Sequence, residues 1–284
     1  MPRIDRPSAS VLPPRTAATP STGADAAAST AAAKPVGDRV ALSTVPAPRE
    51  LRDFTPFLEN QNKNGTTNGC GTTSLAMVLS AWKNEPGAYT REKIDASIRR
   101  FNAPTSPQNI VGYAESQGMR AVAQNNGSID DLKRFVDQGV PVQIMYDPDA
   151  NGSDSTLHYV VVTDYEADEK GNITGLKIAD PWGGKVKTVP IDEFKERWDD
   201  LGLLGRSTGL NNLMIPMLPE ENTPIKGKDG QVRQSKDIQL PKGGNLGWRM
   251  GIADLGFDIA NGASKALDAV KSAPKKIWNA ITSL

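Results

Sequence analysis

The sequence predicts an α+β domain, with helices in its first half and mostly strands in its second half. After Cys70, apolar residues recur at helical spacing, whereas short apolar segments separated by turns dominate from residue 140 onward. Because helices and strands are segregated along the chain rather than alternating, we expect a helical part packed on an antiparallel sheet. The apolar positions that define the first helix are Leu75, Val78, Leu79 and Trp82.

Start signals mark the other helices. A second helix is expected around 91–101. Ser106 and Pro107 are typical of an N-cap followed by a first-turn proline. Ser128 and Asp131 have the spacing of a capping box, which predicts the start of a fourth helix. A glycine follows each of the last two helices and serves as the stop.

The strands follow in the second half of the domain. The predicted strands are 119–123, 140–146, 157–165, 173–180 and 213–218, with a short helix over 192–198. A polar turn over 166–172 joins the third and fourth of these strands into a hairpin.

The composition divides the chain into four segments. Residues 1–45 are rich in Ala, Ser, Thr and Pro, and we expect a disordered leader, either a tether or a secretion or processing signal. Residues 46–218 form the predicted folded domain, and 219–245 read as a linker. The tail over 246–284 has helical spacing. It is expected to pack on the domain, or alternatively to meet a partner or a membrane surface.

The charge and hydropathy patterns exclude several classes of function. Lys plus Arg and Asp plus Glu both number 33, and no long basic run is present, so nucleic acid is not an expected partner. The sequence contains no stretch of about eighteen apolar residues, so no membrane span is expected. The N-terminus lacks the apolar core of a secretory signal peptide, which predicts a cytoplasmic protein or export by a non-classical route.

The chain has one cysteine, Cys70, and one histidine, His158. A single Cys excludes a disulfide within the chain, and one Cys with one His is too few for an ordinary zinc site. We therefore expect neither a metal nor another cofactor. Each role in a thiol-based mechanism also has one candidate.

Cys70 stands where a loop rich in Gly and Asn passes directly into the first predicted helix. Unpaired N–H groups at a helix start stabilise a thiolate and lower its pKa. Gly69 and Gly71 flank the cysteine and would let a substrate approach closely. A buried structural cysteine is the alternative, and this setting fits it poorly.

His158 and Asp180 lie on the two strands of the predicted hairpin. If the hairpin is symmetric about Glu169, His158 faces Asp180 and Val160 faces Ile178. Facing side chains are about 5 Å apart, so the carboxylate can accept an imidazole N–H. A thiol nucleophile needs a base, and the base needs a group that orients it. Cys70, His158 and Asp180 supply these three roles.

These motifs, in this order, resemble the C39-like branch of the papain-like cysteine peptidases. The matching stretches are 68–79 (NGCGTTSLAMVL), 157–165 (LHYVVVTDY) and 178–183 (IADPWG), within a resemblance that covers about 55–218. The resemblance implies a papain-like fold, in which a helical part carrying Cys70 packs on an antiparallel sheet carrying His158 and Asp180. It also implies a peptide or protein substrate, since relatives include enzymes that cut leader peptides after small residues.

One position departs from the family pattern. The family has a Gln six residues before the Cys, which helps to stabilise the oxyanion, whereas position 64 here is Asn. Gln61 lies nine residues before Cys70 and could be presented by a longer loop, with Asn64 and Asn68 as rivals. The backbone N–H of Cys70 is the second expected donor.

The leading expectation is a cysteine peptidase that acts through a Cys70 thioester. A papain-fold deamidase or acyltransferase toxin is the first alternative, because the same three side chains serve several acyl acceptors. An inactive binding module on the same fold is the second alternative, and retention of all three side chains argues against it.

Overall fold

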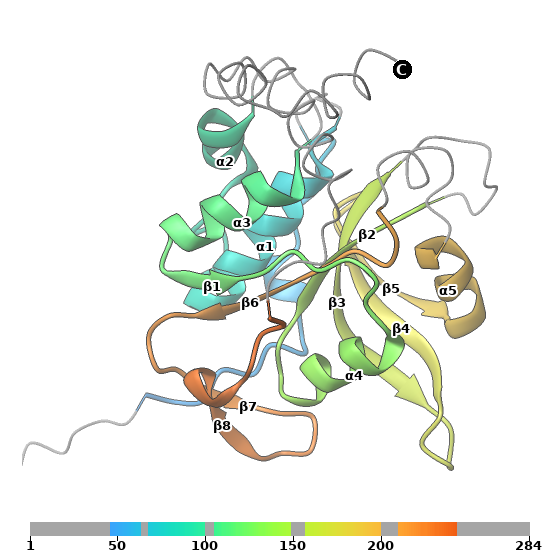
Figure 1. Cartoon of the computed structure of the whole chain (residues 1–284). Helices are drawn as coiled ribbons and strands as arrows, with labels where there is room; N and C mark the ends of the chain where they lie inside the picture. The colour runs from blue at the N-terminus through green and yellow to red at the C-terminus, as the bar shows by residue number, and fades with distance from the viewer. Residues whose placement is uncertain (1–45, 64–67, 100–104, 149–156, 200–209, 243–284) are drawn as a thin grey trace, which may run out of the picture. The chain divides into compact units, whose positions relative to one another are not determined.

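The computed structural model describes residues 46–63, 68–99, 105–148, 157–199 and 210–242 (Figure 1). These residues form a helical part and a six-stranded sheet, which confirms the predicted α+β class. The expected leader over 1–45 and the expected tail over 246–284 lie outside the described residues.

The helical part is built around α1 (Cys70–Lys83). Every residue from Gly71 to Trp82 is buried, because α1 packs on the sheet and is covered by other helices. The helix ends at Asn84, whose left-handed conformation (φ 57°) supplies the C-terminal cap. The neighbouring helices are η1 (Thr55–Phe57), α2 (Arg91–Ile98) and α3 (Pro107–Ser116), and Ser106 caps α3 as predicted.

The sheet has the strand order β1-β6-β2-β3-β4-β5, and all its pairings are antiparallel. In Figure 1, β2 to β5 lie beside α5, whereas β1 and β6 run beneath α3. The strands are β1 (Met119–Ala121), β2 (Val142–Tyr146), β3 (His158–Ala167), β4 (Ile173–Asp180), β5 (Lys185–Pro190) and β6 (Met214–Pro219).

Two further helices, α4 and α5, contact the sheet. The predicted capping box is present at the start of α4 (Ile129–Asp137), where Ser128 Oγ accepts from Asp131 N at 3.0 Å and Asp131 Oδ2 accepts from Ser128 N at 3.1 Å. Helix α5 (Ile191–Asp199) buries Phe194 and Trp198 against the strands.

Strand β5 has no counterpart among the predicted strands. It is the edge strand of the sheet, and most of its side chains are exposed. Its sequence, KVKTVP, therefore lacks the apolar pattern that marks a strand buried on one face.

The register of the β3–β4 hairpin differs from the prediction by two residues at both ends and by three over 164–166, between two register shifts. Ile178 pairs with Val162, not with Val160, and Ala167 pairs with Ile173. The cause is the turn, where Asp168 Oδ1 accepts from the backbone N–H groups of residues 170 and 172 at 2.9 and 2.8 Å. These bonds centre the turn one residue later than expected. A shift of two residues keeps the side chains on the same faces.

The expected linker over 219–245 is wrong for the part that the structure describes, up to residue 242. It forms β7 (Pro224–Lys226), β8 (Val232–Gln234) and η2 (Ser235–Asp237). Ile225 and Ile238 are buried in the core, and Lys228 Nζ binds Asp164 Oδ1 at 2.6 Å. These contacts come from residues distant in the sequence, so local composition does not predict them.

Candidate active site

Cys70 is the first residue of α1, and its side chain is partly buried. The residues around it explain both neighbouring glycines. A Cβ at Gly69 would lie 2.4 Å from Arg91 Cζ, and a Cβ at Gly71 would lie 3.1 Å from the Tyr159 ring. Both glycines were expected to let a substrate approach. In the structure they face protein atoms, and the lack of a side chain lets α1 begin in close contact with Arg91 and Tyr159.

His158 is the first residue of β3, and Asp180 is the last residue of β4. Extending the observed register by one residue puts Asp180 opposite Val160, so Asp180 is a diagonal neighbour of His158 on the same face. His158 Nε2 and Asp180 Oδ1 are 2.7 Å apart. The predicted contact is present, although the register that predicted it is not.

The structure also brings Cys70 to His158. His158 is close enough to lower the pKa of the Cys70 thiol through a hydrogen bond and through its charge, and because Asp180 occupies Nε2, the Nδ1 atom is the one left for the sulfur. The start of α1 therefore lies near the ends of β3 and β4 that carry His158 and Asp180.

The charges of these groups support one another. Burial raises the pKa of the Cys70 thiol, but the hydrogen bond and charge of His158 outweigh it, and the pKa is lowered. Burial lowers the pKa of His158, whereas Asp180 and Cys70 raise it, to about 9. Burial raises the pKa of Asp180, but bonds from His158 and Lys187 lower it to about 2. The shifts of the thiol pKa and the imidazole pKa are both in the direction that favours a thiolate beside an imidazolium.

Gln61 is held close to this arrangement by its backbone. Its N–H donates to the Pro181 carbonyl at 2.9 Å, and its carbonyl accepts from Arg91 Nη1. The side chain is 8% exposed, and its Oε1 atom has no hydrogen-bond partner among the described residues. Of the two rivals, Asn64 lies outside the described residues, and Asn68 precedes α1 with a φ of 58°.

A buried ionic network joins the Gln61 segment to the helix of Cys70. Arg91 Nε donates to Asp95 Oδ2 at 3.1 Å, and Thr72 Oγ1 of α1 donates to Asp95 Oδ1 at 2.6 Å. Arg99 adds a second guanidinium to Asp95 at 2.8 Å. Arg91 therefore touches Gln61, Gly69 and Asp95 together, which fixes the loop against α1.

Sequence reasoning missed three more side chains at the site. Lys187 Nζ lies 2.8 Å from Asp180 Oδ2, and it was missed because strand β5 was missed. Trp182 follows the Asp-Pro pair and is 53% exposed, with its ring edge-on to His158 at 5.9 Å between centroids. Tyr146 is the β2 partner of His158, with ring centroids 6.0 Å apart.

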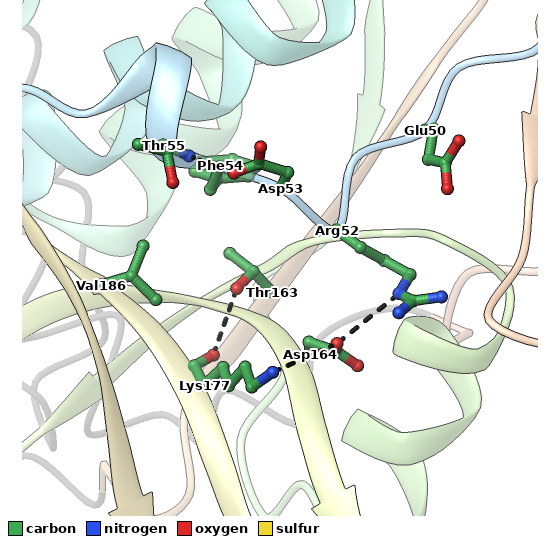
Figure 2. A pocket seen from close by; sticks show the side chains of 9 residues that line it. All are labelled: Glu50, Arg52, Asp53, Phe54, Thr55, Thr163, Asp164, Lys177 and Val186. Atoms are coloured by element: carbon green, nitrogen blue, oxygen red, sulfur yellow. Dashed lines mark hydrogen bonds and ion pairs between the residues drawn. The ribbon is translucent and has the colours of Figure 1, made fainter.

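Two pockets are lined by residues other than Cys70, His158 and Asp180. One, of about 390 Å³, is lined by Arg52, Thr163, Asp164, Lys177 and their neighbours, and Figure 2 shows Arg52 and Lys177 turned toward Asp164. The other, of about 490 Å³, lies beside the Gln61 segment. It is lined by Leu58, Glu59, Asn60, Lys63, Thr90, Arg91, Glu92, Gly183 and Gly184.

The described residues contain neither a metal-site cluster nor a membrane-spanning helix. Within the described ranges, no group of three or more His, Cys, Asp or Glu side chains could hold a metal ion. No helix in that same part of the chain is long and apolar enough to span a bilayer.

Comparison with known proteins places this arrangement in a family. The model of the Peptidase_C39 like family matches residues 55–205, which confirms the resemblance carried by the motifs. A comparison with curated proteins finds no match.

Several solved structures are similar to this chain. A C39-like peptidase from Bacillus anthracis is 18% identical, with 63% of this chain and 100% of that chain covered and a TM-score of 0.45. The peptidase domain of Streptococcus ComA, a bi-functional ABC transporter, is 19% identical, covering 57% and 97%, with a TM-score of 0.41. A double glycine motif protease from an AMS/PCAT transporter, in complex with the leader peptide, is 18% identical, covering 53% and 84%, with a TM-score of 0.37.

Proposed function

Since the chain belongs to the Peptidase_C39 like family, we propose that it is a cysteine peptidase that cleaves peptide bonds through Cys70, His158 and Asp180. The observation that carries the proposal is the placement of one imidazole between a thiol and a carboxylate. His158 Nε2 is 2.7 Å from Asp180 Oδ1, and the same imidazole lowers the pKa of the thiol at the start of α1 through a hydrogen bond and its charge.

The first half of the reaction makes a thioester. The Cys70 thiolate attacks the substrate carbonyl carbon, and the carbonyl oxygen takes up the negative charge. The Cys70 N–H lies in the first turn of α1, where backbone donors lack helical partners, and the Gln61 amide is the second donor. His158 then gives its proton to the leaving amine, the C–N bond breaks, and the acyl group remains on sulfur.

The second half releases the acyl group. Neutral His158 takes a proton from water, the resulting hydroxide attacks the thioester carbonyl, and the C–S bond breaks. The products are a carboxylic acid and the Cys70 thiolate, with the proton back on His158. Asp180 keeps the imidazole in the tautomer that presents Nδ1 to the sulfur and stabilises the charged ring.

A peptide library tests the proposal. The purified chain is incubated with peptides derived from a whole proteome, and new peptide termini are identified by mass spectrometry. Wild-type protein is expected to generate new termini at a restricted sequence pattern, whereas Cys70→Ala and iodoacetamide-treated protein generate none.

Two other outcomes correspond to the alternative functions. Ammonia release from glutamine-containing proteins without any new termini would assign deamidation or acyl transfer and contradict the peptidase. Absence of cleavage, of ammonia release and of any adduct with a peptide-epoxide probe would assign an inactive binding module.

A further inference from the structure

The Asp180 carboxylate has more partners than its role beside His158 requires. Oδ1 lies 2.7 Å from His158 Nε2 and accepts from the Trp182 backbone N–H at 2.8 Å. Oδ2 lies 2.8 Å from Lys187 Nζ, and Asp180 itself is 3% exposed. The carboxylate therefore bridges two groups that can both be cationic.

Lys187 reaches Asp180 from the edge strand. Lys187 of β5 pairs with Ile178 of β4, so Asp180 is its diagonal neighbour on the same face. The ammonium group also lies 5.9 Å from the centre of the Tyr146 ring, and Tyr146 pairs with His158 across β2 and β3. The Lys187 side chain is 32% exposed, so its ammonium keeps part of its hydration.

We propose that Lys187 is a positioning residue that acts on His158 through Asp180, by sharing the negative charge of that carboxylate. The proposal rests on the proposed function, because it assigns Lys187 a task in the same site. The second cation reduces the negative charge that the imidazolium experiences, and so keeps His158 a stronger acid toward the leaving amine.

The charged and titratable groups around His158 come from five elements. They are Cys70 on α1, Tyr146 on β2, Asp180 on β4, Lys187 on β5 and Arg197 on α5, which acts on Tyr146. Among the described residues, His158 and Lys187 are the cations paired with Asp180. Lys187 is therefore the group whose removal changes the charge balance of the triad most directly.

The two possible roles of Lys187 have opposite signs. If the ammonium shares the charge of Asp180, its removal strengthens the pull of Asp180 on the imidazolium and raises the pKa of His158. If Lys187 only keeps the strand in place, its removal loosens the bond between His158 and Asp180 and lowers that pKa.

The test uses the single histidine of the chain, whose imidazole signals are unambiguous in an NMR titration. In Lys187→Gln, which keeps a donor but not the charge, the pKa of His158 is expected to rise by about half a unit or more. Lys187→Met is expected to give the same shift, and Lys187→Arg none. Lys185→Met is the matched control: Lys185 pairs with Asp180 across β4 and β5, but it is exposed, and the ion pair of Asp180 is formed by Lys187. The control is therefore expected to shift the His158 pKa much less than Lys187→Gln.

Turnover of a cleaved peptide is the second readout. Lys187→Gln is expected to lower kcat by about threefold to tenfold with KM unchanged, and to move the alkaline limb of the pH profile upward. A downward or absent shift of the His158 pKa in Lys187→Gln, or an equal shift in Lys185→Met, would overturn the proposal. Failure to cleave any peptide would refute the proposed function. The titration needs no substrate, so the shift of the His158 pKa in the Lys187 variants could still be interpreted.

Discussion

At the scale of single residues, the account depends on three side chains that converge from distant parts of the chain. Cys70 comes from a helix start, whereas His158 and Asp180 come from neighbouring strands. Each is chemically ordinary in isolation. Their proximity lowers the pKa of the Cys70 thiol and raises the pKa of the His158 imidazole to about 9.

The role of Asp180 is tested by Asp180→Asn. The amide keeps the shape but loses the charge, so the pKa of His158 should fall and turnover should drop by about 10- to 10³-fold. Peptide turnover and an NMR titration of His158 measure these two effects.

Asp164→Asn is the matched control, because Asp164 is also a buried carboxylate with a lysine partner, but it lies away from the thiol. Its loss should lower the free energy of unfolding by about 1–3 kcal/mol and leave turnover nearly unchanged. A larger loss of turnover in Asp164→Asn than in Asp180→Asn would mean that the third member of the triad is misassigned.

The oxyanion role of Gln61 is tested by Gln61→Ala. Loss of one oxyanion donor should reduce kcat by about 10²- to 10³-fold, because the amide stabilises charge that develops in the transition state. The rate of Cys70 alkylation should stay unchanged, since alkylation forms no oxyanion. A greater loss of kcat in Asn68→Ala would transfer the role to Asn68.

Much of this site was predictable from the sequence, because a chain with one Cys and one His offers no other candidates. The contact between His158 and Asp180 was predicted from an incorrect register. The contact is nevertheless present because the error at this end of the hairpin is two residues, and an even offset preserves the face. Lys187 was not predictable, since an exposed lysine on an edge strand resembles any solvated lysine.

At the scale of elements, local signals predicted the helix starts, and tertiary contacts decided the remainder. Ser106 and the capping box at Ser128 act on backbone groups within three residues, so they are readable from the sequence. Strand β5 pairs with β4, the strand before it, but as an exposed edge strand it lacks a clear apolar pattern. The β7–β8 hairpin is held by contacts with distant segments. Arg49, for example, forms a parallel bridge with Ile225.

The contribution of the β7–β8 hairpin is tested by Ile225→Ala. The side chain is fully buried, so its truncation should lower the free energy of unfolding by about 2–4 kcal/mol in urea denaturation. Val232→Ala on the facing strand of the same hairpin is the control, because Val232 is 52% exposed, and its effect should be within about 0.5 kcal/mol. Equal effects of the two substitutions would show that the hairpin does not pack into the core.

At the scale of the whole molecule, the helical part and the sheet share one hydrophobic core. That core runs from Leu51 and Phe54, through α1 and the strands, to Ile238. The site lies where the two parts meet, so the relative position of α1 and β3 sets the distance between thiol and imidazole. Ser74 Oγ of α1 donates to the Tyr159 carbonyl of β3 at 3.1 Å, directly beside His158, and helps to hold that position.

Removal of residues 1–45 tests whether this core is sufficient. The segment has few large apolar side chains, so the shortened chain should keep its melting temperature within about 2 °C and its thiol reactivity. The melting temperature is measured by differential scanning calorimetry. A decrease of about 10 °C on truncation would show that residues 1–45 contribute to the folded domain.

The most direct test of the central claim is the rate of Cys70 alkylation by iodoacetamide as a function of pH. Any adduct lies on Cys70, because the chain has no other cysteine. The account predicts rapid alkylation well below neutral pH in the wild-type chain, since His158 stabilises the thiolate, and loss of this acidic reactivity in His158→Ala. A wild-type rate that follows a single thiol pKa of about 8.5, unchanged in His158→Ala, would contradict the ion pair and with it the proposed mechanism.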